Sequence, residues 1–131
     1  MKVINKYVYP TSTRAEIEGL RHYTVDGEAR PLPSVTTVLG KTQPKEKQES
    51  LDRWRERIGL REAEKITREA GIRGTAMHKY LEDLIQGERS MDLTDTGQQA
   101  QKMAEVIVDQ GLNRCSEVNG IEAVLYYPGL Y

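Results

Sequence analysis

The spacing of hydrophobic positions changes along the chain, and the change divides it into strand-like and helix-like stretches. Residues 3–9 alternate weakly and are rich in Val, Ile and Tyr, which predicts a β-strand. Residues 21–25 and 29–32 flank Asp26 and Gly27, and an Asp-Gly pair between two such runs predicts a β-hairpin. We therefore expect a small β-meander in the N-terminal part of the chain.

Apolar residues spaced three and four apart follow, as is typical of amphipathic helices. Ser34 is placed to cap a short helix that Gly40 would end, and residues 42–47 are expected to form a loop. A glycine then stands at or just beyond the end of each further helical pattern, where a left-handed conformation would stop the helix. The predicted helices cover residues 48–58, 60–70, 75–85 and 98–110.

Two of these helices carry an apolar face that we expect to be buried. On a helix, residues three and four apart lie on one side and can pack against a neighbouring element. The expected buried faces consist of Met77, Leu81 and Leu84 in the third helix and of Met103, Val106 and Ile107 in the fourth.

The C-terminal run IEAVLYY, within residues 115–127, predicts a strand. No later residues could pair with it, and a lone strand beside a turn is an unusual end for a domain. We therefore expect a single domain over residues 1–131 of α+β class: a small N-terminal β-meander, a helical middle and one further strand. We also expect this domain to be truncated at Tyr131, and its unpaired strand edge to favour self-association.

Composition and charge allow a folded core and exclude little. Of 131 residues, 37% are hydrophobic and 30% charged, and the formal net charge is -1. Residues 41–73 hold ten basic and seven acidic side chains, whereas residues 82–109 hold two basic and seven acidic ones. Cys115 is the only cysteine, so no internal disulfide can form. No apolar run approaches the ~20 residues of a membrane span, so we expect an intracellular, cytoplasmic chain without a membrane partner.

His78 and Glu82 are the strongest candidates for chemistry. They lie four residues apart in the predicted helix 75–85, so they share a face at the edge of the expected buried stripe. A histidine held there, with a carboxylate one turn away, can offer a ring nitrogen to a metal ion. The same spacing is also common in surface pairs of small energetic value, so it does not by itself identify a metal site.

The residues at the start of this helix suggest an anion site. Gly74 permits a tight entry, Thr75 can cap the helix, and Arg73 would add positive charge beside the free N–H groups. An ordinary capped helix start explains the same residues equally well.

The order PSVTTVLG, LDRWRERIG, EAEKI, RGTAMHKYLEDLIQG and IEAVLYYPGLY resembles RecB-like exonucleases of the PD-(D/E)XK superfamily, over most of the chain from residue 33 onward. The Arg-Gly-Thr-x-x-His-x-x-x-Glu core is the most diagnostic part. The resemblance implies a restriction-endonuclease-like fold whose first core strand is IEAVLYY, and hydrolysis of DNA phosphodiester bonds with Mg²⁺ or Mn²⁺. It implies that His78 is a metal ligand, and that Glu82 and Glu122 belong to the catalytic set.

The resemblance is incomplete, which leaves other functions open. The family's Gly-x-x-Asp and Asp/Glu-x-Lys elements, which follow the core strand, are absent from these 131 residues. We therefore expect the N-terminal portion of a DNA exonuclease that is inactive as this fragment. The expected partner is DNA that is single-stranded or has a free end. The alternatives are a non-catalytic helical nucleic-acid-binding or interaction module, with Arg53 and Arg57 tracking a strand and Trp54 stacking on a base, and a small structural protein. Trp54 is in register with Leu51 and Ile58, which favours a core position for it.

Overall fold

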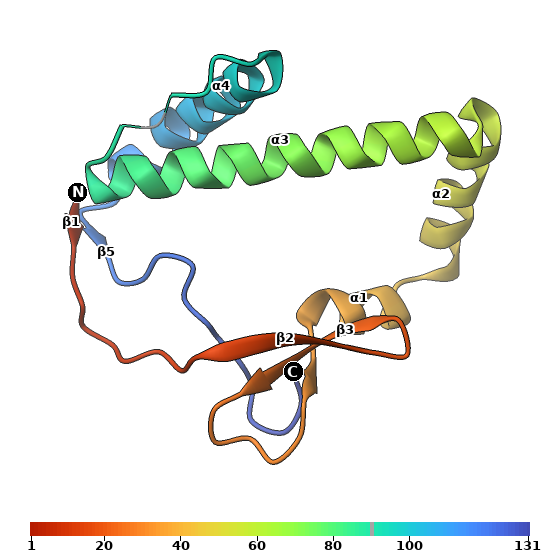
Figure 1. Cartoon of the computed structure of the whole chain (residues 1–131), viewed down its shortest axis with the longest axis horizontal. Helices are drawn as coiled ribbons and strands as arrows, with labels where there is room; N and C mark the ends of the chain where they lie inside the picture. Colours follow the sequence, from red (N-terminus) through yellow and green to blue (C-terminus); the bar gives the residue numbers. More distant parts are fainter. Residues whose placement is uncertain (90) are drawn as a thin grey trace. The chain divides into compact units, whose positions relative to one another are not determined.

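The computed structural model describes residues 1–89 and 91–131, which divide into two compact units. Unit 1 comprises residues 1–6 and 55–121, and unit 2 comprises residues 7–54 and 122–131. Both units combine helix with strand, which confirms the α+β class (Figure 1). Identity with a restriction-endonuclease-like fold and the single-domain organisation stay predictions, and each unit is described by itself.

Unit 2 is built on a three-stranded antiparallel sheet in the order β2-β3-β4. The strands are β2 (Ser12–Ile17), β3 (Leu20–Val25) and β4 (Leu32–Pro33). β3 and β4 are the hairpin predicted around Asp26 and Gly27, although only two residues of β4 pair. Val25 and Leu32 are buried between them and form the small core of this unit.

A tight turn joins β2 to β3, and its backbone explains the strand that the hydrophobic pattern missed. Glu18 and Gly19 both have positive φ, at 53° and 74°, as a two-residue hairpin turn requires. The turn sets Ile17 opposite Leu20 and pairs all of β2 with β3. β2 has the sequence STRAEI, in which no hydrophobic alternation marks a strand. The prediction of a strand over residues 3–9 was wrong except at its start, because only β1 (Lys2–Val3) pairs, with β5 (Glu117–Val118) in unit 1.

Helix α1 (Val35–Thr42) begins where the sequence predicts and ends later. The Ser34 hydroxyl accepts a hydrogen bond from the backbone N–H of Thr37 at 3.1 Å, which confirms the predicted N-cap. The helix continues through Gly40 and ends before Pro44, because a residue that precedes proline is pushed out of the helical region. Helix α2 (Lys45–Ile58) follows directly, so most of the loop predicted over residues 42–47 is helical. It ends at Gly59, which has φ of 88°.

Helix α3 (Leu60–Gln86) is one uninterrupted helix of 27 residues. The prediction of two helices separated near Gly71 was wrong, because Gly71 and Gly74 both keep helical backbone. Only Gly87 ends the helix, with the left-handed conformation that C-terminal caps commonly use.

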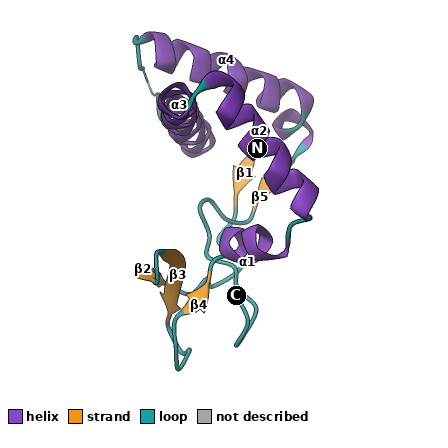
Figure 2. Ribbon diagram, turned by 90° about the vertical axis from the view of Figure 1, so that its right-hand side faces the viewer, coloured by secondary structure: helices purple, strands orange, loops and turns teal. Residues whose placement is uncertain are grey.

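Helix α4 (Asp95–Gln110) packs beside the C-terminal half of α3 within unit 1 (Figures 1 and 2). Its buried residues are small: Gly97, Ala100 and Ala104, spaced three and four apart. The predicted buried face of this helix was therefore wrong, since small residues permit close backbone approach while the larger apolar ones are left outside. Met103, Val106 and Ile107 are 41%, 52% and 38% exposed.

The C-terminal region forms less strand than its composition predicts. After the short 3₁₀ helix Leu112–Arg114, only β5 is a strand, and residues 121–127 pair with no strand in the described part of the chain. The strand predicted for IEAVLYY was therefore wrong in this structure, because a strand needs a neighbour with which to share its hydrogen bonds. In unit 2 the segment after residue 122 instead lies against the sheet, where the Gly129 N–H donates to a Glu28 carboxylate oxygen at 3.3 Å.

Candidate functional site

His78 and Glu82 lie one turn apart on α3, with His78 exposed and Glu82 half-buried. Their shared face follows from helix geometry alone, because four residues amount to about 400° of rotation. The predicted surroundings of His78 were wrong, however. The stripe that it was expected to border is only half-buried at Met77 and Leu81, and Leu84 is exposed.

The face of α3 that packs against α4 lies on the other side of the helix from His78. A cavity between the two helices is lined by Ala76, Lys79 and Tyr80 of α3 and by Gly97 of α4. His78 is two residues from Tyr80, which turns it about 200° round the axis. α4 therefore packs on one side of α3, and the exposed His78 lies on the opposite side.

Asp83 is the buried acid of this helix, and sequence reasoning did not find it. Its relative exposure is 5%, and the Lys79 ammonium donates to its carboxylate at 2.5 Å. This hydrogen bond is the main reason that the pKa of Lys79 is raised above its usual value, with the charge of Asp83 adding to it. Lys and Asp four residues apart are a common surface pair on helices, so no local signal in the sequence marks Asp83 as a buried residue.

The anion site predicted at Gly74 and Thr75 does not exist as proposed. Both residues lie in the interior of α3, where backbone N–H groups are used by the helix itself, so Thr75 caps nothing. Its side chain is exposed on the helix surface. Arg73 is half-buried, and its guanidinium makes a long 3.5 Å hydrogen bond to the side-chain oxygen of Gln99 on α4. Arg73 therefore helps to hold the two helices together.

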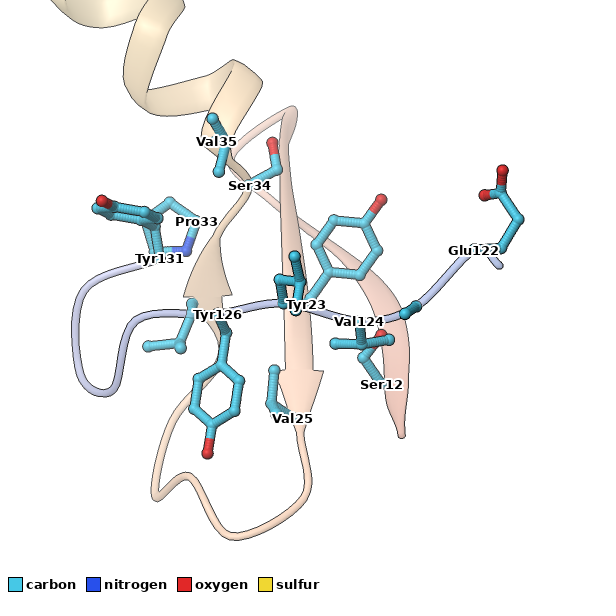
Figure 3. Close-up of a pocket in the computed structure, with 13 residues that line it drawn as sticks. Ser12, Tyr23, Val25, Pro33, Ser34, Val35, Glu122, Val124, Tyr126 and Tyr131 are labelled. Atoms are coloured by element: carbon cyan, nitrogen blue, oxygen red, sulfur yellow. The ribbon is translucent and has the colours of Figure 1, made fainter. Parts of the chain in front are cut away.

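Glu122 lies in unit 2 and not on a strand. Its backbone has φ of 49°, which a continuous strand does not allow. It stands at the rim of a cavity of about 360 Å³ that is lined by Tyr23, Val25 and Tyr126 among others. Figure 3 shows its carboxylate directed away from the Tyr23 and Tyr126 rings. The structure therefore does not supply the strand from which the expected role of Glu122 was inferred.

Arg53 and Arg57 are both exposed on α2, four residues apart, and Trp54 between them is half-buried. Partial burial is consistent with packing of Trp54 against neighbouring residues, which is the position that its register with Leu51 and Ile58 favours. It is less consistent with an open ring that stacks on a base.

The residues predicted to bind metal fall short of a complete site. Among residues 1–89 and 91–131, no three His, Cys, Asp or Glu side chains come together in a way that could hold a metal ion. A Mg²⁺ ion takes about six ligands, chiefly oxygens, and His78 with Glu82 could supply two at most. These two residues do not by themselves fit a Mg²⁺ or Mn²⁺ ion.

Comparisons with known proteins add no assignment: no protein-family model, no curated protein and no solved structure matches the chain. Within the described residues, no helix is both long enough and apolar enough to cross a membrane.

Proposed function

We propose that the chain carries the first motif of a metal-dependent DNA exonuclease of RecB-like type, which acts with Mg²⁺ or Mn²⁺. One observation carries the proposal: Arg-Gly-Thr-x-x-His-x-x-x-Glu lies on a single continuous helix, with His78 and Glu82 one turn apart on the side away from α4. The proposal requires further ligands, including the acidic and Lys elements that the resemblance implies, in addition to His78 and Glu82.

The packing around α3 supports a ligand role for His78. A ligating histidine must keep one ring nitrogen accessible while its helix is held in place. The contact between α3 and α4 holds the helix, and His78 is exposed on the opposite side of α3. In such nucleases a bound divalent ion supplies an activated water and stabilises the charge that develops on the phosphate.

The test compares three variants in the natural gene product that contains these residues. His78→Ala should reduce Mn²⁺-dependent degradation of labelled single-stranded DNA by orders of magnitude and leave the melting temperature unchanged, because the side chain is exposed. Glu82→Gln should lose about 10–100-fold if Glu82 supports the ligand instead of binding the ion. Met77→Ala is the matched control, since the neighbouring half-buried side chain should affect stability and not hydrolysis.

Two results would contradict the proposal. If the gene product degrades no DNA with either Mg²⁺ or Mn²⁺, it is not a nuclease of this kind. If His78→Ala keeps full activity, His78 is not part of the catalytic site. The second candidate, a nucleic-acid-binding module without catalysis, is favoured by the exposure of Arg53 and Arg57 on α2. DNA binding without any metal-dependent cleavage would support this second candidate.

A further inference from the structure

The N-terminal half of α3 presents a line of basic residues that α4 does not cover. Arg61, Lys65 and Arg68 are spaced four and three apart, so they lie on one face, and all three are exposed. None of them forms an ion pair with another residue in the described part of the chain. Glu64 and Glu69 flank the line at about 40° to either side, so the positive charge is confined to a narrow stripe.

An open groove continues this stripe along the same face of the helix. The groove has a volume of about 620 Å³, and we call it the α3 groove. Arg68 and Lys79 stand at its two ends, the exposed Thr75 hydroxyl lies between them, and its surface is otherwise almost entirely apolar. Its lining residues are Arg68, Gly71, Ile72, Thr75, Ala76 and Lys79.

Gly71 leaves the helix backbone uncovered within this groove. Glycine in a helix interior is less favourable than alanine by about 1 kcal/mol, and a Cβ built on Gly71 would meet no atom within 4 Å. The chain itself therefore leaves room for a side chain at this position. A ligand in the groove could approach the helix backbone more closely at Gly71 than at a residue with a side chain.

The geometry points to a single DNA strand that lies along the α3 groove. Phosphates would lie beside Lys65 and Arg68, where the cations are exposed, and one phosphate oxygen would accept from the Thr75 hydroxyl. Sugar or base would rest on Ile72 and pass over Gly71. A single line of cations fits one phosphodiester backbone, whereas a duplex presents two. Lys79 contributes less attraction, because one of its three N–H donors and much of its charge are used by Asp83.

This inference rests on DNA being the substrate of the proposed function, but it concerns binding and can be tested without hydrolysis. The first measurement is fluorescence anisotropy of a labelled oligothymidine in EDTA, between 50 and 200 mM salt. Lys65→Gln with Arg68→Gln should weaken binding by about tenfold or more at 0.1 M salt and lower the salt slope by about 1.4, since each contact to a single strand contributes about 0.7. Lys102→Gln with Arg114→Gln removes the same charge from exposed positions elsewhere in unit 1 and should leave binding unchanged.

A pair of glycine variants separates the groove from general charge effects. Gly71→Ala should raise the melting temperature and weaken DNA binding, because its methyl group would project into the groove. Gly74→Ala is the matched control: it also meets no atom within 4 Å, but it does not line the groove, so it should raise the melting temperature without affecting binding.

The groove assignment is overturned if Gly71→Ala binds DNA as the wild type does, or if the two charge variants lose affinity equally. Binding to phosphatidylserine vesicles in place of DNA, with the same dependence on Lys65 and Arg68, would assign the stripe to a membrane surface instead. The outcomes also separate the two proposals. If the gene product binds DNA through the groove but cleaves none, the groove assignment stands and the proposed nuclease function is rejected. If it cleaves DNA and neither groove variant affects cleavage, the nuclease function stands and the groove assignment is rejected.

Discussion

Replacement of Gly97 by alanine should destabilise the start of helix α4, although the same change stabilises most helices. Gly97 is buried in the first turn of α4. A Cβ built there would lie 2.2 Å from Cγ of Asp92 and 2.5 Å from its Cβ. Rotation of the Asp92 side chain could move the carboxylate but not the Cβ atom, so the backbone before α4 would have to shift.

The magnitude follows from three opposing effects. Alanine gains up to about 1 kcal/mol over glycine in helix propensity. Forcing a methyl group into a filled site costs about 1–3 kcal/mol. Displacement of Asp92 also weakens its exposed hydrogen bonds from the Thr94 backbone and hydroxyl, at 3.0 and 2.6 Å, which adds to the loss. The clash wins, and we expect a net loss of about 1–3 kcal/mol.

The assay is thermal and urea unfolding followed by helical circular dichroism. A loss of 1 kcal/mol should lower the melting temperature by about 3–6 °C at this chain length. Gly71→Ala provides the comparison of opposite sign, since that position is open. In an Asp92→Gly background the clash disappears, and Gly97→Ala should become neutral or stabilising. The reasoning is refuted if Gly97→Ala raises the melting temperature of the otherwise unchanged chain as much as Gly71→Ala does.

Two further predictions concern helix caps. Ser34→Ala should cost about 0.5–2 kcal/mol in urea unfolding, because it removes the acceptor for the Thr37 N–H at the start of α1; Ser50→Ala, at an exposed position in α2, is the control, and an equal loss there would contradict the capping role. The pKa of Asp92 is lowered below 3.8, mainly by the hydrogen bond from the Thr94 side chain. Its stabilising contribution is therefore present above pH 3.8 and is lost as the pH falls through the lower folded-state value. Asp92→Asn should flatten the dependence of the melting temperature on pH in that range, and an unchanged dependence would exclude Asp92 as its source.

Helix ends show which parts of the fold can be read from sequence. Gly59 and Gly87 end their helices with positive φ, as predicted. Gly40 and Gly71 were expected to do the same, but both keep helical backbone. Glycine permits the left-handed conformation without enforcing it, so the outcome depends on whether the following residues gain more by continuing the helix. Pro44 determines where α1 ends, because the residue before a proline is disfavoured in helical conformation.

Burial was less predictable, because hydrophobic periodicity does not describe how closely two helices approach. The pattern favoured the larger apolar side chains of α4, while the structure buries Gly97, Ala100 and Ala104. In the candidate site, the adjacency of His78 and Glu82 was predictable because it is local to one helix. The strand expected to carry Glu122 was not, because pairing depends on residues distant in sequence.

The unequal lengths of α3 and α4 imply a gradient in local opening along α3. Amide hydrogens exchange fastest where a helix has few buried contacts and can unfold without disturbing its neighbours. The turns that contain Lys65 and Arg68 are exposed, whereas the turn that contains Ala76 and Tyr80 lies beside α4. Deuterium uptake should therefore be rapid in the first half of α3 and slow in the second. A DNA strand bound in the α3 groove would slow exchange where the free chain is least protected, and would thereby stabilise the N-terminal half of the helix that carries His78.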